Sequence, residues 1–178
     1  MEEKRKVILY IAQSVDGFIA TEEDDISWLS MVERDGEDYG YEAFVDTVDT
    51  VFMGRRTYEK VLGFGIDFPH KGRNCYVLSK SREGADENVQ FFSGDLVKLV
   101  GEIRSQQGKD IFIDGGSEVV RAFRDHDLID EYVISIIPMM LGKGIRLFRD
   151  TDTTYPMALL ESKAYPSGLV QLRYQRLK

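Results

Sequence analysis

The sequence predicts an α/β fold in which a mixed, mainly parallel central sheet is flanked by helices and completed by a C-terminal antiparallel hairpin. Short apolar, β-branched runs alternate with segments of helical spacing, and glycine-containing turns follow two of these runs. Two further strand-like segments near the C-terminus flank a turn. At 178 residues with 43% hydrophobic content, the chain can bury one substantial core, so we expect a single domain over residues 1–178.

The first half of the chain predicts three strands and two helices. Residues 7–13 and 50–53 are apolar and β-branched, as expected of buried strands. Apolar side chains recur at helical spacing over about 37–45, and a glycine separates the second strand from a helix over 55–62. A third strand is expected over 74–79.

The second half continues the alternation and then departs from it. Residues 89–92 and 111–113 are short apolar strands, each followed by a helix, over 96–104 and from about 117 to 124. This βα alternation implies crossover connections and a mainly parallel sheet. A strand over 131–138 follows. The hairpin is expected from strands at 158–164 and 169–176, joined by the turn Tyr165-Pro166-Ser167-Gly168.

Composition excludes several function classes. The net charge is −8 and no basic cluster occurs, so nucleic acid and membrane partners are not expected. The apolar run after Lys6 is about six residues long, too short for a signal peptide or a membrane span. Cys75 is the single cysteine, which suits a reducing cytoplasm, and His70 and His126 are isolated, so we expect no metal site.

Two glycines separate a strand from a helix in Asp114-Gly115-Gly116-Ser117-Glu118. Open α/β sheets bind ligands at the carboxyl ends of their strands. Backbone without Cβ atoms admits a pyrophosphate there, and the helix N-terminus favours its charge. The alternative is a tight turn in which Ser117 caps the helix and no ligand binds. This motif alone leaves both interpretations open.

Arg55 and Arg56 follow Gly54 at the start of another helix. Cations at this end oppose the helix dipole by about 0.3–1 kcal/mol unless an anion offsets them. A phosphate would do so through charge-assisted hydrogen bonds. The alternative is a pair of surface arginines that reach solvent or nearby carboxylates. We favour the phosphate.

Hydroxyl and cationic side chains follow the third strand in Leu78-Ser79-Lys80-Ser81-Arg82. An acidic residue at this place would accept hydrogen bonds from a free ribose 2′-hydroxyl, so its absence favours NADPH over NADH. For Lys80 and Arg82 taken individually, a solvated loop is the better interpretation. Residues 12–20 form a polar turn that could cover a flat ring.

Together these segments resemble the dihydrofolate reductase superfamily, and most closely the riboflavin-biosynthesis reductase domain, the RibD C-terminal domain family. The matching segments occur in family order over nearly the whole chain, at residues 11–20, 52–59, 77–79, 114–118, 128–131 and 138–144. The resemblance implies a dihydrofolate-reductase-like fold and an NADPH site. The implied cofactor residues are Ala12, Ile19 and Ala20 at the nicotinamide, Gly54, Arg55, Arg56 and Thr57 at phosphates, Leu78, Ser79 and Lys80 at the adenosine 2′-phosphate end, and Gly115, Gly116, Ser117 and Glu118 at the pyrophosphate.

The resemblance also suggests residues for the substrate. Asp38 stands at the distance before Gly54 at which dihydrofolate reductases carry an acidic residue that supports protonation, although a solvated carboxylate is the alternative. Asp16 and Trp28 are candidates for substrate binding, and Trp28 alternatively packs in the core. The run from Tyr132 to Leu141 is a possible homodimer interface, with a core strand as the alternative for its first half.

The predicted function is hydride transfer from NADPH to an electrophilic C=N or C=O carbon of a small molecule. The resemblance implies a ribosylamino-pyrimidine as substrate, in a reaction like that of 5-amino-6-(5-phosphoribosylamino)uracil reductase in riboflavin biosynthesis. Without the His-x-Glu and Pro-Cys-x-x-Cys motifs of a zinc deaminase, the chain would act as a stand-alone reductase. The alternatives are reduction of dihydrofolate or another pterin-like compound, and a non-catalytic NADPH-binding module.

Overall fold

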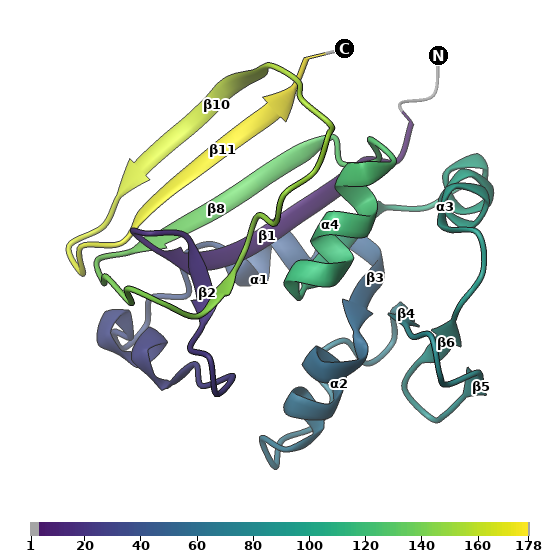
Figure 1. Ribbon diagram of the computed structural model, residues 1–178, viewed down its shortest axis with the longest axis horizontal. Coiled ribbons are helices and arrows are strands. Elements are labelled where there is room, and N and C mark those ends of the chain that lie inside the picture. Colours follow the sequence, from purple (N-terminus) through teal and green to yellow (C-terminus); the bar gives the residue numbers. More distant parts are fainter. Residues whose placement is uncertain (1–3, 178) are drawn as a thin grey trace.

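A computed structural model describes residues 4–177, and a nine-stranded sheet is the centre of the molecule (Figure 1). The strand order is β10-β11-β8-β1-β7-β3-β4-β6-β5. Neighbouring strands are parallel from β8 through β6, whereas β10, β11 and β8 pair antiparallel, as do β5 and β6. The predicted mixed, mainly parallel sheet with a C-terminal antiparallel hairpin is confirmed.

The helices and strands follow the predicted order, with several short additions. The strands are β1 (Val7–Ser14), β2 (Phe18–Ala20), β3 (Val48–Gly54), β4 (Asn74–Leu78), β5 (Gly84–Ala85), β6 (Gln90–Phe92), β7 (Asp110–Gly115), β8 (Glu131–Ile137), β9 (Ile145–Arg146), β10 (Met157–Ala164) and β11 (Val170–Arg176). The helices are the 3₁₀ helix η1 (Ser27–Val32), α1 (Tyr41–Val45), α2 (Arg55–Leu62), α3 (Leu96–Ser105) and α4 (Ser117–Asp125).

Helices cover both faces of the sheet, as crossover connections require. In Figure 1, α4 lies in front of the sheet and α1 lies behind it. On the α3 and α4 side, Phe52 of β3 packs against Phe123 of α4 with ring centroids 5.1 Å apart, and both are fully buried. On the other side, Phe112 of β7 packs against Phe44 of α1 at 4.9 Å. This two-sided burial explains why the central strands are apolar throughout.

The helix predicted over residues 37–45 begins only at Tyr41. Tyr39 and Gly40 have φ angles of 58° and 81°, in the left-handed region, so the backbone before Tyr41 is not helical. The carboxylate of Asp38 accepts hydrogen bonds from the backbone N–H groups of Gly40 and Glu42, at 2.9 and 2.8 Å. Asp38 therefore orders the start of α1.

A small second sheet pairs β2 with β9, and the sequence pattern did not predict it. Phe18 pairs with Arg146, and Ala20 with Ile145. The close approach depends on Gly144, whose φ angle is 151° and where a Cβ atom would lie 2.2 Å from the carbonyl oxygen of Ala20. This pairing places Ile145 at the wall of the cavity described below.

The apolar run from Tyr132 to Leu141 is largely internal. Strand β8 is hydrogen-bonded to β1 on one edge and to β11 on the other, so it has no free edge for pairing with a second copy. Beyond the strand, the side chain of Met140 is 67% exposed. The homodimer stays a prediction, now resting on residues after Ile137. Among residues 4–177, no helix combines the length and apolarity needed to cross a membrane.

Candidate functional site

A cavity of about 1490 Å³ opens at the carboxyl ends of β1, β3, β4 and β7. Single-ligand pockets usually occupy about 300–1,000 Å³, so this one has room for a dinucleotide and a substrate together. It collects side chains from distant parts of the chain. The predicted cofactor residues that line it are Ala12, Ile19, Ala20, Gly54, Arg55, Arg56, Thr57, Leu78, Ser79, Lys80, Gly116, Ser117 and Glu118, and Gly115 precedes Gly116 at its edge.

The two glycine turns lie side by side in this cavity. An added Cβ on Gly54 would lie 3.7 Å from the backbone nitrogen of Gly116, and one on Gly116 would lie 3.5 Å from the Thr57 hydroxyl. Strands β3 and β7 are neighbours, so the helices that follow them begin next to each other. Glycine leaves open the space between these turns, which a side chain would otherwise occupy.

Helices α2 and α4 both begin at a glycine without a side-chain cap. By contrast, α3 is capped by Asp95, whose carboxylate accepts a hydrogen bond from the backbone N–H of Lys98 at 3.0 Å. Ser117 does not cap α4, because it is the first residue of the helix and its hydroxyl accepts a hydrogen bond from Arg149 Nε at 3.1 Å. Two adjacent uncapped N-termini form a favourable anion site.

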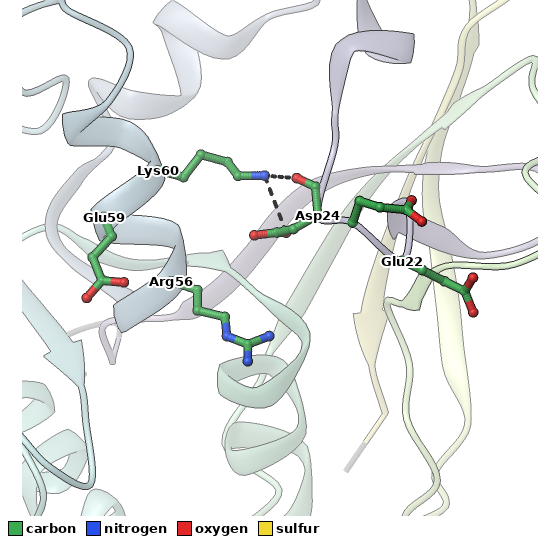
Figure 2. Close-up of a pocket in the computed structure, with 6 residues that line it drawn as sticks. Glu22, Asp24, Arg56, Glu59 and Lys60 are labelled. Carbon is green, nitrogen blue, oxygen red and sulfur yellow. Dashed lines mark hydrogen bonds and ion pairs between the residues drawn. The ribbon is translucent and has the colours of Figure 1, made fainter.

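The two arginines at the start of α2 differ in their contacts. Arg55 forms an ion pair with Glu59 of the same helix at 3.3 Å. Arg56 has no hydrogen bond or ion pair with any residue from 4 to 177, and in Figure 2 its guanidinium points away from Glu59 and no dashed line reaches it. A phosphate could therefore bind Arg56 without breaking an existing contact of its guanidinium. Arg56 is the better placed of the two for a phosphate.

A smaller hollow of about 490 Å³ adjoins the cavity beside Arg56 (Figure 2). Here a hydrogen bond and an ion pair connect the loop after β2 to α2. Lys60 Nζ contacts the backbone oxygen of Asp24 and, at 3.3 Å, its carboxylate. Both residues also line the large cavity. The Asp24–Lys60 contact thus forms part of its side wall.

In the turn after β4, Ser79 orders the backbone and Lys80 is exposed. The Ser79 side chain is nearly buried, and its hydroxyl accepts hydrogen bonds from the backbone N–H groups of Ser81 and Arg82. Lys80 is exposed and makes no ion pair within the described part of the chain. Residues 79–82, directly after β4, include no carboxylate, the group that in an NAD-specific site would hold a ribose hydroxyl.

Sequence reasoning missed several residues that line the cavity. Arg149, from the loop after β9, contacts Glu118 as well as Ser117 and so lies across the first turn of α4. Asp114 lines the cavity at the end of β7. Its place directly before Gly115 was the one available signal. Nothing local marks Arg149, which is 32 residues from Ser117 and reaches it only through the fold.

The family model of the RibD C-terminal domain matches residues 71–171 of this chain, more than half of its length. The chain belongs to the RibD C-terminal domain family. A relative, the uncharacterised protein YwjB of Bacillus subtilis (strain 168), is 40% identical over 174 residues, which span 97% of this chain and 99% of YwjB.

Solved structures place this RibD C-terminal domain within the dihydrofolate-reductase-like fold. A protein from Shewanella sp. PV-4, provisionally assigned to riboflavin biosynthesis, superposes with a TM-score of 0.90 at 30% identity over 97% of this chain and 99% of its own. The deaminase and 5-amino-6-(5-phosphoribosylamino)uracil reductase of Thermotoga maritima gives a TM-score of 0.72 at 16% identity. The match covers 98% of this chain and 57% of the Thermotoga chain. Dihydrofolate reductase of Enterococcus faecalis, complexed with NADP(H), gives 0.66 at 16% over 97% of each chain.

The three residues predicted to act on the substrate lie outside the cavity of the RibD C-terminal domain. Asp38 caps α1, and its backbone hydrogen bonds hold its pKa below the usual value. Asp16 accepts hydrogen bonds from the Ser14 hydroxyl and from two backbone N–H groups of residues 141 and 142, which lower its pKa. Trp28 is packed in a buried cluster with Val32. In this structure each of the three side chains makes local contacts, and the substrate roles of Asp16, Trp28 and Asp38 stay predictions.

Proposed function

We propose that this chain is an NADPH-dependent reductase of a small molecule. The observation that carries the proposal is the convergence of the predicted cofactor residues on one cavity, at two uncapped helix N-termini. Four separate segments of the sequence contribute to it. Membership of the RibD C-terminal family and the fold shared with an NADP(H)-bound dihydrofolate reductase support the same conclusion.

The proposed binding mode assigns a task to each wall of the cavity. The backbone N–H groups at the start of α4, with Gly116 leaving the approach open, bind the pyrophosphate. Arg56 and Lys80, both without protein partners among residues 4–177, bind the 2′-phosphate. Ala12 and Ile19 present small and apolar surfaces to the nicotinamide. The bound cofactor supplies a hydride to an electrophilic carbon, and the protein holds both rings at reacting distance.

Fluorescence titration of the purified protein with NADPH and with NADH tests the cofactor proposal. A charged hydrogen bond contributes about 1.5–3 kcal/mol, so Arg56→Ala should weaken NADPH binding about tenfold or more. The effect on NADH should be smaller because that dinucleotide lacks the 2′-phosphate. Arg55→Ala should cost less, since Arg55 already pairs with Glu59. Arg34→Ala, an exposed arginine outside the cavity, is the matched control. Failure of the wild type to bind either dinucleotide would refute the proposal.

We further propose a ribosylamino-pyrimidine as the substrate, reduced to its ribitylamino form. The reductase activity of the Thermotoga maritima protein and the family assignment support this choice. An absorbance assay of NADPH oxidation tests this choice, with either the phosphoribosylamino-pyrimidine or dihydrofolate as the substrate. If only dihydrofolate is reduced, the proposed pyrimidine substrate is wrong and dihydrofolate takes its place. Tight NADPH binding without oxidation by either compound would instead favour the non-catalytic module.

A further inference from the structure

The chain between β9 and β10 brings an arginine onto the first turn of α4. The side chain of Leu147 is fully buried, and its backbone N–H donates to a backbone oxygen of the turn between β1 and β2 at 2.9 Å. The backbone oxygen of Arg149 accepts a hydrogen bond from Arg124 Nη1 at 3.1 Å. The Thr151 hydroxyl contacts the carboxylate of Asp125 at 2.6 Å. These contacts hold the backbone on both sides of Arg149, so its side chain starts from a defined place.

The guanidinium of Arg149 is only partly used by the protein. Its Nε donates to the hydroxyl of Ser117 at 3.1 Å, and its Nη1 contacts the carboxylate of Glu118. Ser117 is 4% exposed, so its hydroxyl is a fixed acceptor. A guanidinium has five N–H donors. No hydrogen bond or ion pair within residues 4–177 uses Nη2. Because Arg149 lines the large cavity, its remaining donors are available to a ligand there.

The carboxylate of Glu118 stands where an anion is proposed to bind. Glu118 belongs to the first turn of α4 and lines the cavity. A carboxylate accepts hydrogen bonds and carries the same sign of charge as a pyrophosphate, so the two groups repel each other. The side chain of Glu118 is 71% exposed and forms its ion pair with Arg149. Glu118 can therefore assist the binding of an anion only through Arg149.

Arg149 differs from other paired arginines that line the cavity. Arg55 and Arg121 each pair with a carboxylate four residues further along their own helix. Arg149 instead reaches α4 from a separate segment and contacts two neighbouring side chains of its first turn. Two contacts to different nitrogens fix the orientation of a planar guanidinium, which a single ion pair does not. Arg149 is thus held in one orientation before any ligand binds.

We propose that Arg149 binds the pyrophosphate of the dinucleotide through the free donors of its guanidinium, and that Glu118 is the positioning residue that holds Arg149 for this contact. This rests on the proposed NADPH-dependent function. The guanidinium adds charged donors to the backbone N–H groups at the start of α4, and it also offsets the charge of Glu118 on the same turn. The pyrophosphate is common to NADPH and NADH, whereas Arg56 and Lys80 are proposed to contact the 2′-phosphate that only NADPH carries.

Fluorescence titration with NADPH and with NADH distinguishes this contact from one at the 2′-phosphate. Arg149→Ala should weaken the binding of both dinucleotides about tenfold, and the ratio of their two dissociation constants should change less than twofold. Lys143→Ala removes the same charge from an exposed residue outside the cavity that pairs with Glu22. This matched control should change either dissociation constant less than twofold. Urea unfolding of each variant establishes that it folds.

Two substitutions at Glu118 separate positioning from charge. Glu118→Gln and Glu118→Ala remove the same charge, but the glutamine keeps an oxygen that can accept a hydrogen bond from Arg149 Nη1. Glu118→Ala should therefore bind both dinucleotides about threefold to tenfold more weakly than Glu118→Gln. When Arg149→Ala is added to each, the two double variants should bind equally, because no guanidinium remains to be held.

The results that would overturn these roles differ from the result that would refute the cofactor site. Unchanged affinity in Arg149→Ala, or a loss for NADPH alone, would show that Arg149 does not contact the pyrophosphate. Equal affinities of Glu118→Gln and Glu118→Ala in the presence of Arg149 would contradict the positioning role of Glu118. A wild type that binds neither dinucleotide would instead refute the proposed NADPH-dependent function on which both roles rest.

Discussion

Replacing Glu131 with glutamine should lower the free energy of unfolding by about 2 kcal/mol at neutral pH. Glu131 begins β8, between β1 and β11, and its side chain is 2% exposed. Its Oε1 lies 3.0 Å from Lys6 Nζ. Its Oε2 accepts from Arg173 Nε and Nη2 at 2.9 and 2.6 Å. The carboxylate thus joins the N-terminal and C-terminal strands of the sheet.

The exposure of the partners limits the magnitude. Removing one member of a fully buried ion pair costs about 3–5 kcal/mol because the other charge is stranded. Here the charges left behind are Lys6 and Arg173, whose side chains are 33% and 44% exposed and can be rehydrated. The loss then approaches that of charged hydrogen bonds, about 1.5–3 kcal/mol. For a chain of this size that corresponds to a fall in Tm of about 4–8 °C.

The effect should depend on pH with a defined sign. Burial alone would raise the pKa of Glu131, but the hydrogen bonds and charges of Arg173 and Lys6 outweigh it and hold that pKa below its usual value. A lowered folded pKa gives stability that is complete above the unfolded value of about 4.3 and is lost as pH falls through the folded pKa. The difference between wild type and Glu131→Gln should persist at about pH 5–7 and shrink below about pH 4.

Urea unfolding followed by circular dichroism at several pH values measures this difference. Glu161→Gln, the same substitution at an exposed position of β10, is the control and should change stability by less than about 0.5 kcal/mol. A loss at Glu131 no larger than at Glu161, or a loss of equal size at pH 7 and in acid, would refute the reasoning.

Three further outcomes are expected. Asp38→Ala should destabilise the fold by about 1 kcal/mol through loss of its cap on α1, and NADPH oxidation should be unchanged; a selective loss of turnover would support Asp38 as the proton donor. Cys75, buried and with its pKa raised to about 12, should resist iodoacetamide at neutral pH until the protein is denatured, and rapid native labelling would contradict its burial. Arg149→Ala should weaken NADPH binding about tenfold because its guanidinium lies across the first turn of α4, and unchanged affinity would remove it from the site.

The position of the wall proposed to bind the cofactor could be predicted from sequence because its signals are local. Gly54 and Gly116 each stand between an apolar run and a helical segment, and the folded strands bring these two turns together automatically, since β3 and β7 are neighbours. The two arginines after Gly54 add a charge signal at the same place. A short stretch of sequence thus indicated both the turn geometry and the positive charge at this place.

The pairing of His70 with Asp114 at the cavity could not be predicted because it is a non-local contact. His70 and Asp114 are 44 residues apart, and their pairing depends on how the segment before β4 packs against β7. Asp38 had the right spacing from Gly54, but Tyr39 and Gly40 take left-handed backbone angles that delay the helix, so its carboxylate caps α1. Spacing along the chain does not determine which way such a side chain points.

A crystal structure of the protein with bound NADPH tests the account most directly. We predict that the pyrophosphate lies at the N-terminus of α4 beside Gly116, with the 2′-phosphate within hydrogen-bond distance of Arg56 or Lys80. The nicotinamide should lie against Ala12, on the side of the cavity where Asp114 is exposed. NADPH bound anywhere outside this cavity, or no bound dinucleotide at a saturating concentration, would contradict the proposed function.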